Sequence, residues 1–162
     1  MGKKLPEITI LRDSREKQGW WFDEEEKKPG KVRVLGTVES CLNAGDYSIV
    51  GLEDKIRIER KNGFGELFGN YWPKDNQERF IRECEKLVDI PHKYLLVETS
   101  LNYDTFGLSV PQMIKGPPVK RVVDWILQIS LNYGIQPIFV GDSGQYIAKS
   151  LFCQVARMYK YI

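Results

Sequence analysis

The first half of the chain has a hydrophobic pattern that predicts β-strands. Its apolar residues occur in short runs rich in valine and isoleucine, and in places they alternate with polar residues, as strand residues do. The predicted strands cover residues 8–11, 32–38, 46–50 and 55–60. Residues 51–54 are expected to join the last two strands as a hairpin.

A polar segment separates the first two predicted strands. Residues 18–31 begin near the aromatic cluster Trp20-Trp21-Phe22, continue through a charged run and end at a Pro-Gly pair, which predicts a turn. The segment is therefore expected to be a surface excursion. Aromatic side chains can stack on unpaired bases, but we expect at least one of the three to pack in the core.

From residue 64 onward, helical periodicity alternates with strands. Apolar residues between 64 and 88 recur at a spacing of three to four, which predicts helical structure with a break near Trp72-Pro73. Further helices are predicted at 119–133 and 145–161, with strands at 94–97 and 135–140. This order predicts an α/β fold with a central mixed β-sheet flanked by helices, and the length of 162 residues predicts one domain.

Charge and hydropathy set limits on the partners and the location of the protein. The 24 Lys and Arg residues oppose 22 Asp and Glu, a net charge of +2, so a nucleic-acid-binding face must be local. No apolar run approaches the roughly 20 residues that cross a bilayer, and the N-terminus lacks the apolar core of a secretory signal. We therefore expect a soluble, cytoplasmic protein without membrane contact.

Cysteine and histidine usage argues against several classes of site. Cys41, Cys84 and Cys153 are odd in number and widely spaced, which predicts reduced, buried thiols instead of a disulfide framework or a zinc cluster. His92 is the only histidine and is expected in a loop before a strand. This argues against histidine-based nucleases, zinc hydrolases and Ser-His-Asp hydrolases.

The segment 55–61 carries the strongest candidate chemistry. If it is a strand, Glu59 and Lys61 share one face because side chains alternate with period two. This is the geometry that a Glu-x-Lys nuclease strand requires: the carboxylate binds a divalent cation, and the lysine stands beside the water that attacks the phosphodiester and the phosphate that is cut. Asp46, at the head of the neighbouring strand, supplies the second carboxylate that Mg²⁺ commonly needs. The alternative is an exposed salt bridge along a strand.

The Glu-x-Lys spacing has little value by itself. It also occurs at Glu25 and Glu26, within the charged run, and at Glu53, in the predicted hairpin turn. Only Glu59 combines it with an alternating strand and an upstream Gly-Asp pair. A second charged group, residues 13–16, follows the first strand, where α/β sheets tend to build sites. Its arginine could bind a phosphate, although a charged turn is the simpler alternative.

Three motifs occur in the order of a known nuclease family: they are Asp13-x-Arg15-Glu16, Gly45-Asp46-Tyr47 and Glu59-Arg60-Lys61. Together they resemble the nuclease domain of the XPF/Mus-type structure-specific endonucleases, in the restriction-endonuclease-like PD-(D/E)XK superfamily. The surrounding residues look still more similar to short, stand-alone members from bacteria and phages. The resemblance covers roughly residues 8–100 by motif.

The resemblance implies a restriction-endonuclease-like core built around a metal ion, Mg²⁺ with Mn²⁺ as a substitute. The implied catalytic residues are Asp13, Glu16, Asp46, Glu59 and Lys61. The implied metal ligands are Asp13, Asp46, Glu59 and the backbone carbonyl of Arg60. The candidates for contacts to DNA phosphates are Arg15, Arg60, Arg79 and Lys120.

The function that follows is metal-dependent hydrolysis of phosphodiester bonds by an endonuclease. Branched, flapped or forked DNA in repair, recombination or replication is the expected substrate, and a bacterial cell or a phage-infected host is the expected setting. A non-catalytic DNA-binding or scaffold module and an exonuclease of the same fold stay open as alternatives. A homodimer through the apolar C-terminal helix is also expected.

The sequence departs from the family pattern at two points. Longer members have an acidic residue four positions after the motif lysine, where this chain has Gly65 with Glu66 beside it. Many members also append a helix-hairpin-helix module. We expect residues 1–162 to form a single nuclease domain without one.

Overall fold

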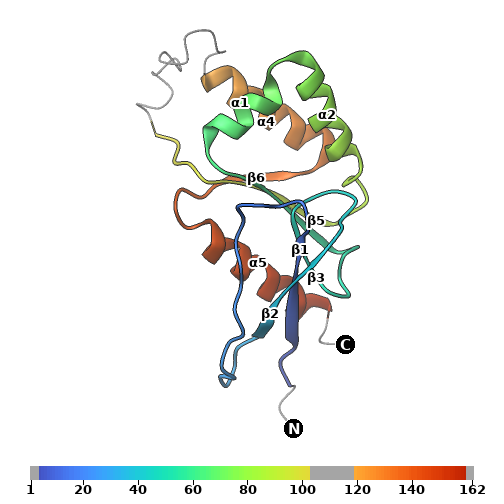
Figure 1. Ribbon diagram of the computed structural model, residues 1–162, viewed down its shortest axis with the longest axis vertical. Coiled ribbons are helices and arrows are strands. Elements are labelled where there is room, and N and C mark those ends of the chain that lie inside the picture. Colours follow the sequence, from blue (N-terminus) through green and yellow to red (C-terminus); the bar gives the residue numbers. More distant parts are fainter. Residues whose placement is uncertain (1–3, 103–118, 160–162) are drawn as a thin grey trace.

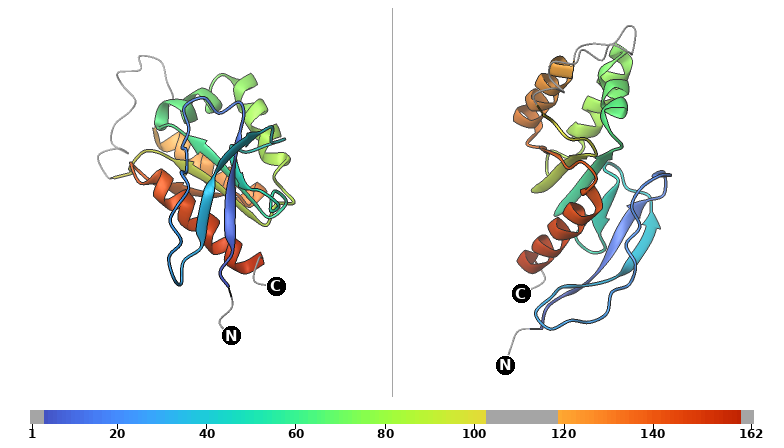
Figure 2. Two further views of the ribbon diagram at one scale, coloured as in Figure 1. Left: turned by 60° about the horizontal axis from the view of Figure 1, so that its bottom comes forward. Right: turned by 90° about the vertical axis from the view of Figure 1, so that its left-hand side faces the viewer.

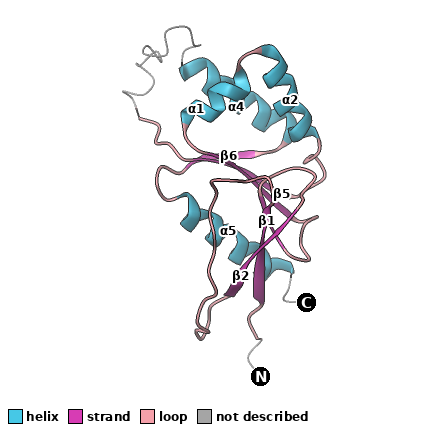
Figure 3. Ribbon diagram, viewed as in Figure 1, coloured by secondary structure: helices cyan, strands magenta, loops and turns pink. Residues whose placement is uncertain are grey.

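The computed structural model describes residues 4–102 and 119–159 and contains a six-stranded sheet flanked by helices. Figure 1 shows the arrangement, and Figure 3 marks helices and strands by colour. In chain order the elements are β1 (Glu7–Asp13), β2 (Arg33–Ser40), β3 (Tyr47–Ile49), β4 (Ile56–Lys61), α1 (Phe64–Tyr71), α2 (Lys74–Glu85), β5 (His92–Val97), α4 (Val119–Tyr133), β6 (Gln136–Phe139) and α5 (Gly144–Tyr159). The sheet order is β2-β1-β3-β4-β5-β6.

One strand of the sheet runs against the other five. Strand β3 is antiparallel to both β1 and β4, whereas β1 pairs with β2, and β4 with β5 and β5 with β6, in parallel. The carboxyl ends of β1, β4 and β5 therefore lie at the same edge of the sheet as the start of β3. We call this the carboxyl edge, and the opposite end the amino edge. The predicted mixed sheet is confirmed.

The two faces of the sheet bury separate hydrophobic clusters. Ile56 and Ile58 of β4 belong to the cluster that includes Phe152 of α5. Leu95 of β5 belongs to the cluster formed with α1, α2 and α4, while its neighbour Leu96 belongs to the first. This alternation is the period-two pattern of a strand buried on both faces. Figure 2 likewise shows α5 apart from the other three helices.

Most of the predicted elements are present, and their limits shift by a few residues. The helical pattern over 64–88 divides into α1 and α2 on either side of Trp72-Pro73, as expected, but α2 ends at Glu85 and Val88 is 50% exposed. His92 begins β5 instead of preceding it: it pairs with Ile56 of β4, and its backbone N–H donates at 3.0 Å to the carbonyl of Lys55, the residue before that strand.

The segment between β1 and β2 is more than a surface excursion. It has no helix or strand over residues 18–31 and turns at 29–30, as predicted. However, Trp20 and Phe22 are buried in the cluster beneath α5, whereas Trp21 is 46% exposed. Close packing requires glycine at position 19, because a Cβ there would lie 1.8 Å from the Tyr47 hydroxyl oxygen. The expected core role is confirmed for two of the three aromatics.

Two expectations about buried surfaces are corrected or weakened. All three cysteines are free, but Cys41 is exposed, because it follows β2 at the open border of the sheet; only Cys84 is fully buried.

The apolar face of α5 packs on its own sheet through residues such as Phe152 and Val155, so the surface on which a homodimer was expected is largely occupied within the chain. None of the described helices is long and apolar enough to cross a membrane.

Candidate active site

Backbone hydrogen bonds bring the three motifs together at the carboxyl edge. Asp13 is the last residue of β1, and its N–H donates to the Asp46 carbonyl at 2.7 Å. The Asp46 N–H in turn donates to the Ile58 carbonyl of β4 at 2.8 Å. Asp13, Asp46 and the end of β4 thus meet through main-chain contacts, although they are far apart in sequence.

The turn before Asp46 depends on glycine and on a buried arginine. Gly45 has φ of 78°, a left-handed conformation that other residues rarely adopt, and a Cβ there would lie 3.4 Å from Arg57 Cβ. The Arg57 guanidinium donates to the Ala44 carbonyl at 2.6 Å and to Asn43 Oδ1 at 2.8 Å. These contacts explain the Gly-Asp pair: the glycine makes the turn and the arginine fixes it.

Asp46 lies in a partly buried and strongly acidic environment. Its Oδ2 accepts the backbone N–H of Arg60 at 2.7 Å. Removal from water and the negative charge of Glu59 raise the pKa of Asp46 to about 8, with a smaller contribution from Glu16, while the Arg60 N–H and Lys61 oppose the rise. The raised pKa favours the protonated form of the Asp46 carboxyl until a cation compensates its charge.

Glu59 and Lys61 share one face of β4, as the period-two pattern predicted. Lys61 Nζ lies 2.8 Å from Glu59 Oε1 and 5.2 Å from the centre of the Phe80 ring of α2. Burial acts to lower the pKa of Lys61, but the charge and hydrogen bond of Glu59, aided by Asp46, outweigh it and the net shift is upward. Lys61 is therefore a cation at neutral pH.

These two side chains open into a cavity of about 410 Å³ beside α1 and α2. Its walls are formed by Glu59, Lys61, Glu66, Gly69, Asn70, Asn76, Arg79, Phe80 and Glu83. Arg79 therefore lines the same cavity as Glu59 and Lys61, and its guanidinium donates to Asn76 Oδ1 at 2.6 Å. Lys120 instead pairs with Asp124 on the exposed side of α4 at 2.7 Å and does not line this cavity.

The first motif is held by arginines. Asp13 forms an ion pair with Arg15 at 2.8 Å, and the same guanidinium donates to the Leu42 carbonyl at 2.6 Å. Glu16 lies 3.7 Å from Arg60. Arg15 remains 64% exposed, so its guanidinium is open to solvent and to an incoming phosphate, but both carboxylates already have cationic partners.

Arg60 and two residues that sequence reasoning did not assign to the site form a buried network. The Arg60 guanidinium lies 2.7 Å from Glu98 and 5.4 Å from the centre of the Trp20 ring, and Trp20 Nε1 donates to Glu98 at 2.7 Å. The Arg60 side chain is only 8% exposed. This placement favours a structural role for Arg60 over a phosphate contact. The available signal for Glu98 was its position directly after the apolar run 94–97.

The donor set suits a small divalent cation only in part. Within residues 4–102 and 119–159, no three His, Cys, Asp or Glu side chains are placed to hold one metal ion. The three carboxylate ligands that the resemblance implies, Asp13, Asp46 and Glu59, are thus not gathered around one point in the described chain, because Asp13 faces Arg15. Glu16, the other implied catalytic carboxylate, faces Arg60. The negative charge of Glu59 acts on Asp46, and one or two carboxylates with phosphate and water are the usual ligands of Mg²⁺. These two fit such an ion.

Comparisons with known proteins relate the chain through its structure. No protein-family model and no curated protein matches the sequence. The structure is similar to XPF from Aeropyrum pernix, with a TM-score of 0.55 and 16% identity over 93% of this chain and 60% of that chain. It is also similar to XPF from Aeropyrum pernix in complex with DNA, with a TM-score of 0.56, 16% identity and coverage of 93% and 66%.

The chain therefore spans less than two thirds of each of these XPF chains. At 16% identity the likeness establishes the fold, and function has to be argued from the site. The resemblance inferred from the three motifs is confirmed at the level of the fold: the chain has the α/β fold of these XPF chains, a mixed sheet flanked by helices.

Proposed function

We propose that this protein is a metal-dependent DNA endonuclease that hydrolyses phosphodiester bonds. The observation that carries the proposal is the pairing of Glu59 and Lys61 at 2.8 Å on one strand face, open to a cavity and beside Asp46. The XPF-like fold supports it, and so does the DNA present in one of the similar structures.

The residues divide the chemistry between them. Asp46 and Glu59 would hold Mg²⁺ or Mn²⁺, with the backbone carbonyl of Arg60 as a further ligand. The ion, when bound, lowers the pKa of a coordinated water and offsets charge that develops on the phosphate. Lys61, cationic and fixed against Glu59, stabilises the pentacovalent oxyanion. Arg79 on the cavity wall binds a neighbouring phosphate of the same strand.

Branched, flapped or forked DNA is the substrate class that we propose. The cavity is open, and its charged lining residues are three carboxylates and two cations, so a phosphate backbone would enter it together with the divalent cation that offsets the carboxylates. A panel of linear, flapped, forked and four-way DNAs with Mg²⁺ tests this directly. Cutting confined to the branched substrates is expected, whereas equal cutting of linear duplex would contradict the proposed selectivity.

The panel also needs a matched pair of variants. Glu59→Ala should abolish cutting, and Glu53→Ala should not, since Glu53 has the same Glu-x-Lys spacing but lies in the β3–β4 turn. DNA binding without any cutting by the wild-type protein would favour the non-catalytic module. Cutting limited to DNA with free ends would favour the exonuclease.

A homodimer remains a prediction. Tyr146 and Met158 of α5 are 69% and 60% exposed and are the large apolar side chains that this helix leaves available to a second copy. Sedimentation of the purified protein should show a species of twice the chain mass, and a single species at 18.8 kDa would contradict the prediction.

A further inference from the structure

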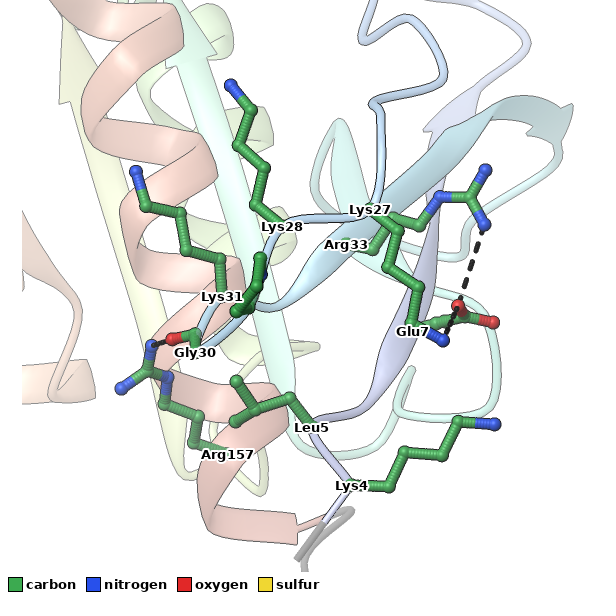
Figure 4. A pocket seen from close by; sticks show the side chains of 10 residues that line it. Lys4, Leu5, Glu7, Lys27, Lys28, Gly30, Lys31, Arg33 and Arg157 are labelled. Carbon is green, nitrogen blue, oxygen red and sulfur yellow. Dashed lines mark hydrogen bonds and ion pairs between the residues drawn. The ribbon is translucent and has the colours of Figure 1, made fainter. Parts of the chain in front are cut away.

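The amino edge of the sheet carries a groove that the proposed chemistry does not use. Its volume is about 460 Å³, and six of its ten lining residues are lysine or arginine, against one carboxylate. Figure 4 shows these side chains around the opening. We call it the basic groove, and it is lined by Lys4, Leu5, Glu7, Lys27, Lys28, Pro29, Gly30, Lys31, Arg33 and Arg157.

The fold assembles this groove from segments that are distant in sequence. Parallel pairing of β1 with β2 sets Glu7 opposite Arg33. The turn at 29–30 presents the lysines around it, and buried Val32 ties that turn to the core. The last turn of α5 supplies Arg157, whose guanidinium donates to the Gly30 carbonyl at 3.4 Å.

Most of the positive charge in the groove is uncompensated. Glu7 lies 3.8 Å from Lys27 and 3.6 Å from Arg33, and Arg33 also pairs with Glu24. Within the described part of the chain, the other four cations form no salt bridge: they are Lys4, Lys28, Lys31 and Arg157. The whole chain has a net charge of only +2, so the groove is a local concentration of positive charge.

A second cavity of about 580 Å³ extends this surface along α5. It shares three cations with the basic groove, namely Lys28, Lys31 and Arg157. Its own acidic residues are Glu25 and Glu26, and Glu25 is already paired with Lys149. Burial acts to raise the pKa of Glu25, but the hydrogen bond and charge of Lys149, together with the Val34 N–H, outweigh it and the pKa is lowered. The charge of Lys28 makes a smaller contribution in the same direction.

The chemistry of the walls indicates what they bind. The basic groove has no aromatic side chain among its lining residues, and only Leu5 and Pro29 are apolar, so it offers no platform for stacked bases. Unpaired lysines are flexible point charges that suit phosphates. Several such cations around one groove suit a polyanion, such as a nucleic-acid backbone.

The position of the groove relates it to the candidate active site. It lies at the start of β1, whereas Asp13 ends that seven-residue strand. The strand spans roughly 20 Å, because its residues rise about 3.3 Å each. That length matches about six base pairs of duplex at ~3.4 Å per base pair.

We propose that the basic groove binds the phosphate backbone of the DNA substrate, in the duplex that flanks the cleavage point. The inference rests on the proposed function, because it identifies the polyanion as the substrate of the same protein. It assigns a holding role to the amino edge and adds nothing to the chemistry of the carboxyl edge.

The test measures binding in a background that does not cut. Every protein carries Glu59→Ala, and fluorescence anisotropy records the affinity for a labelled forked duplex over a series of salt concentrations. The test variant adds Lys28→Ala and Lys31→Ala. The control adds Lys74→Ala and Lys86→Ala, exposed lysines on and next to α2 that carry the same total charge. Circular dichroism melting confirms that each protein is folded.

The groove variant should bind about tenfold more weakly at moderate salt. Its slope of log affinity against log salt should shrink by about two, since each lost phosphate contact contributes roughly 0.9. The control should match the parent protein. Equal affinity and slope in all three proteins would overturn the proposal, and so would equal weakening in both variants.

Two further results separate this proposal from its alternatives. Phosphatidylserine vesicles serve as a probe for an acidic membrane surface: strong binding of vesicles through these lysines, with DNA affinity unchanged, would overturn the proposal. Cutting assays that compare the wild type with Glu59→Ala separate it from the catalytic assignment. If Glu59→Ala still cuts while the groove variant loses affinity, the groove proposal is supported and the catalytic assignment of Glu59 fails. If Glu59→Ala does not cut while the groove variant keeps its affinity, only the groove proposal fails.

Discussion

Two arginines at opposite edges of the sheet each contact two glutamates, in very different surroundings. At the carboxyl edge, Arg60 lies 2.7 Å from Glu98 and 3.7 Å from Glu16, with all three side chains less than one fifth exposed. At the amino edge, Arg33 lies 2.6 Å from Glu24 and 3.6 Å from Glu7, and the exposed fractions are 26%, 64% and 33%. The charges of the first edge are partly withdrawn from water, whereas those of the second remain solvated.

This difference in exposure suits the two edges to different functions, one to catalysis and the other to substrate binding. Partly buried charges interact strongly, shift each other's pKa and hold a fixed geometry, as Asp46, Glu59 and Lys61 do. Solvated charges attract a polyanion over distance but are screened by salt and place it loosely. One edge is therefore suited to chemistry and the other to holding a substrate.

The largest expected effect is on cutting by the carboxyl edge. Lys61→Met removes the cation beside Glu59 and should lower the rate by about 10²–10³-fold, as loss of a fixed charge stabiliser does. Lys55→Met is the matched change, because Lys55 ends the Glu-x-Lys sequence of the β3–β4 turn. Initial rates of DNA cleavage measure both. Equal rates for the two variants would erase the distinction between the edges.

The next effect compares the two bridging arginines by stability. Arg60→Met leaves Glu98 and Glu16 without their cation and should cost about 3 kcal/mol. That loss corresponds to a melting temperature lower by roughly 6–12 °C for a chain of this size. Arg33→Met should cost no more than about 1 kcal/mol, because its partners stay hydrated. Thermal unfolding followed by circular dichroism would contradict the comparison if both variants melted alike.

The third effect is a pH dependence that originates at Asp46. An ordinary aspartate titrates near 3.8, and the folded protein raises the pKa of Asp46 to about 8. Between these values the folded state binds more protons than the unfolded state, so the contribution of Asp46 to stability is full below pH ~4 and is lost as the pH rises toward 8. Asp46→Asn has no such loss.

Melting temperatures in a chelating buffer measure this difference. Wild type should fall relative to Asp46→Asn by several degrees from pH 5 to pH 8, at about 2–4 °C for each kcal/mol. Mg²⁺ binding to the wild type should release a proton and tighten as the pH rises. Parallel melting profiles of the two proteins would contradict the raised pKa.

The smallest expected effect on cutting comes from substitutions at the amino edge. Lys28→Ala with Lys31→Ala, and Glu59 intact, should leave the rate at saturating DNA unchanged, because neither lysine contacts the reacting groups. At low DNA concentration the rate should fall severalfold, and more steeply as salt increases. Kinetics at two salt concentrations measure it. A lower rate at saturating DNA would mean that the groove takes part in the chemical step, which would contradict the division between a catalytic carboxyl edge and a substrate-binding amino edge.

The sequence predicted the parts of the site that depend on local geometry. The alternation in residues 55–61 was sufficient to put Glu59 and Lys61 on one face, and the order of the strands placed Asp46 beside them. The spacing alone was not sufficient, since Glu53 and Lys55 have it within a turn. Strand context distinguished the two cases.

The sequence did not predict the contacts between distant segments. Whether Asp13 faces Arg15 or a metal ion depends on side-chain packing at the end of β1, and the pairing of Arg60 with Glu98 depends on the register of β4 with β5. The basic groove requires the parallel pairing of β1 with β2 and the end of α5. A net charge of +2 gave no indication of it.

The cleavage of covalently closed circular DNA in Mg²⁺ tests the central claim most directly. A closed circle has no ends, so its conversion to nicked or linear forms requires an endonuclease. We expect the wild-type protein and Glu53→Ala to convert it at similar rates, and Glu59→Ala to be slower by on the order of 10³-fold while remaining folded at the assay temperature. Conversion by Glu59→Ala at the rate of Glu53→Ala would contradict the assignment of the carboxyl edge as the active site.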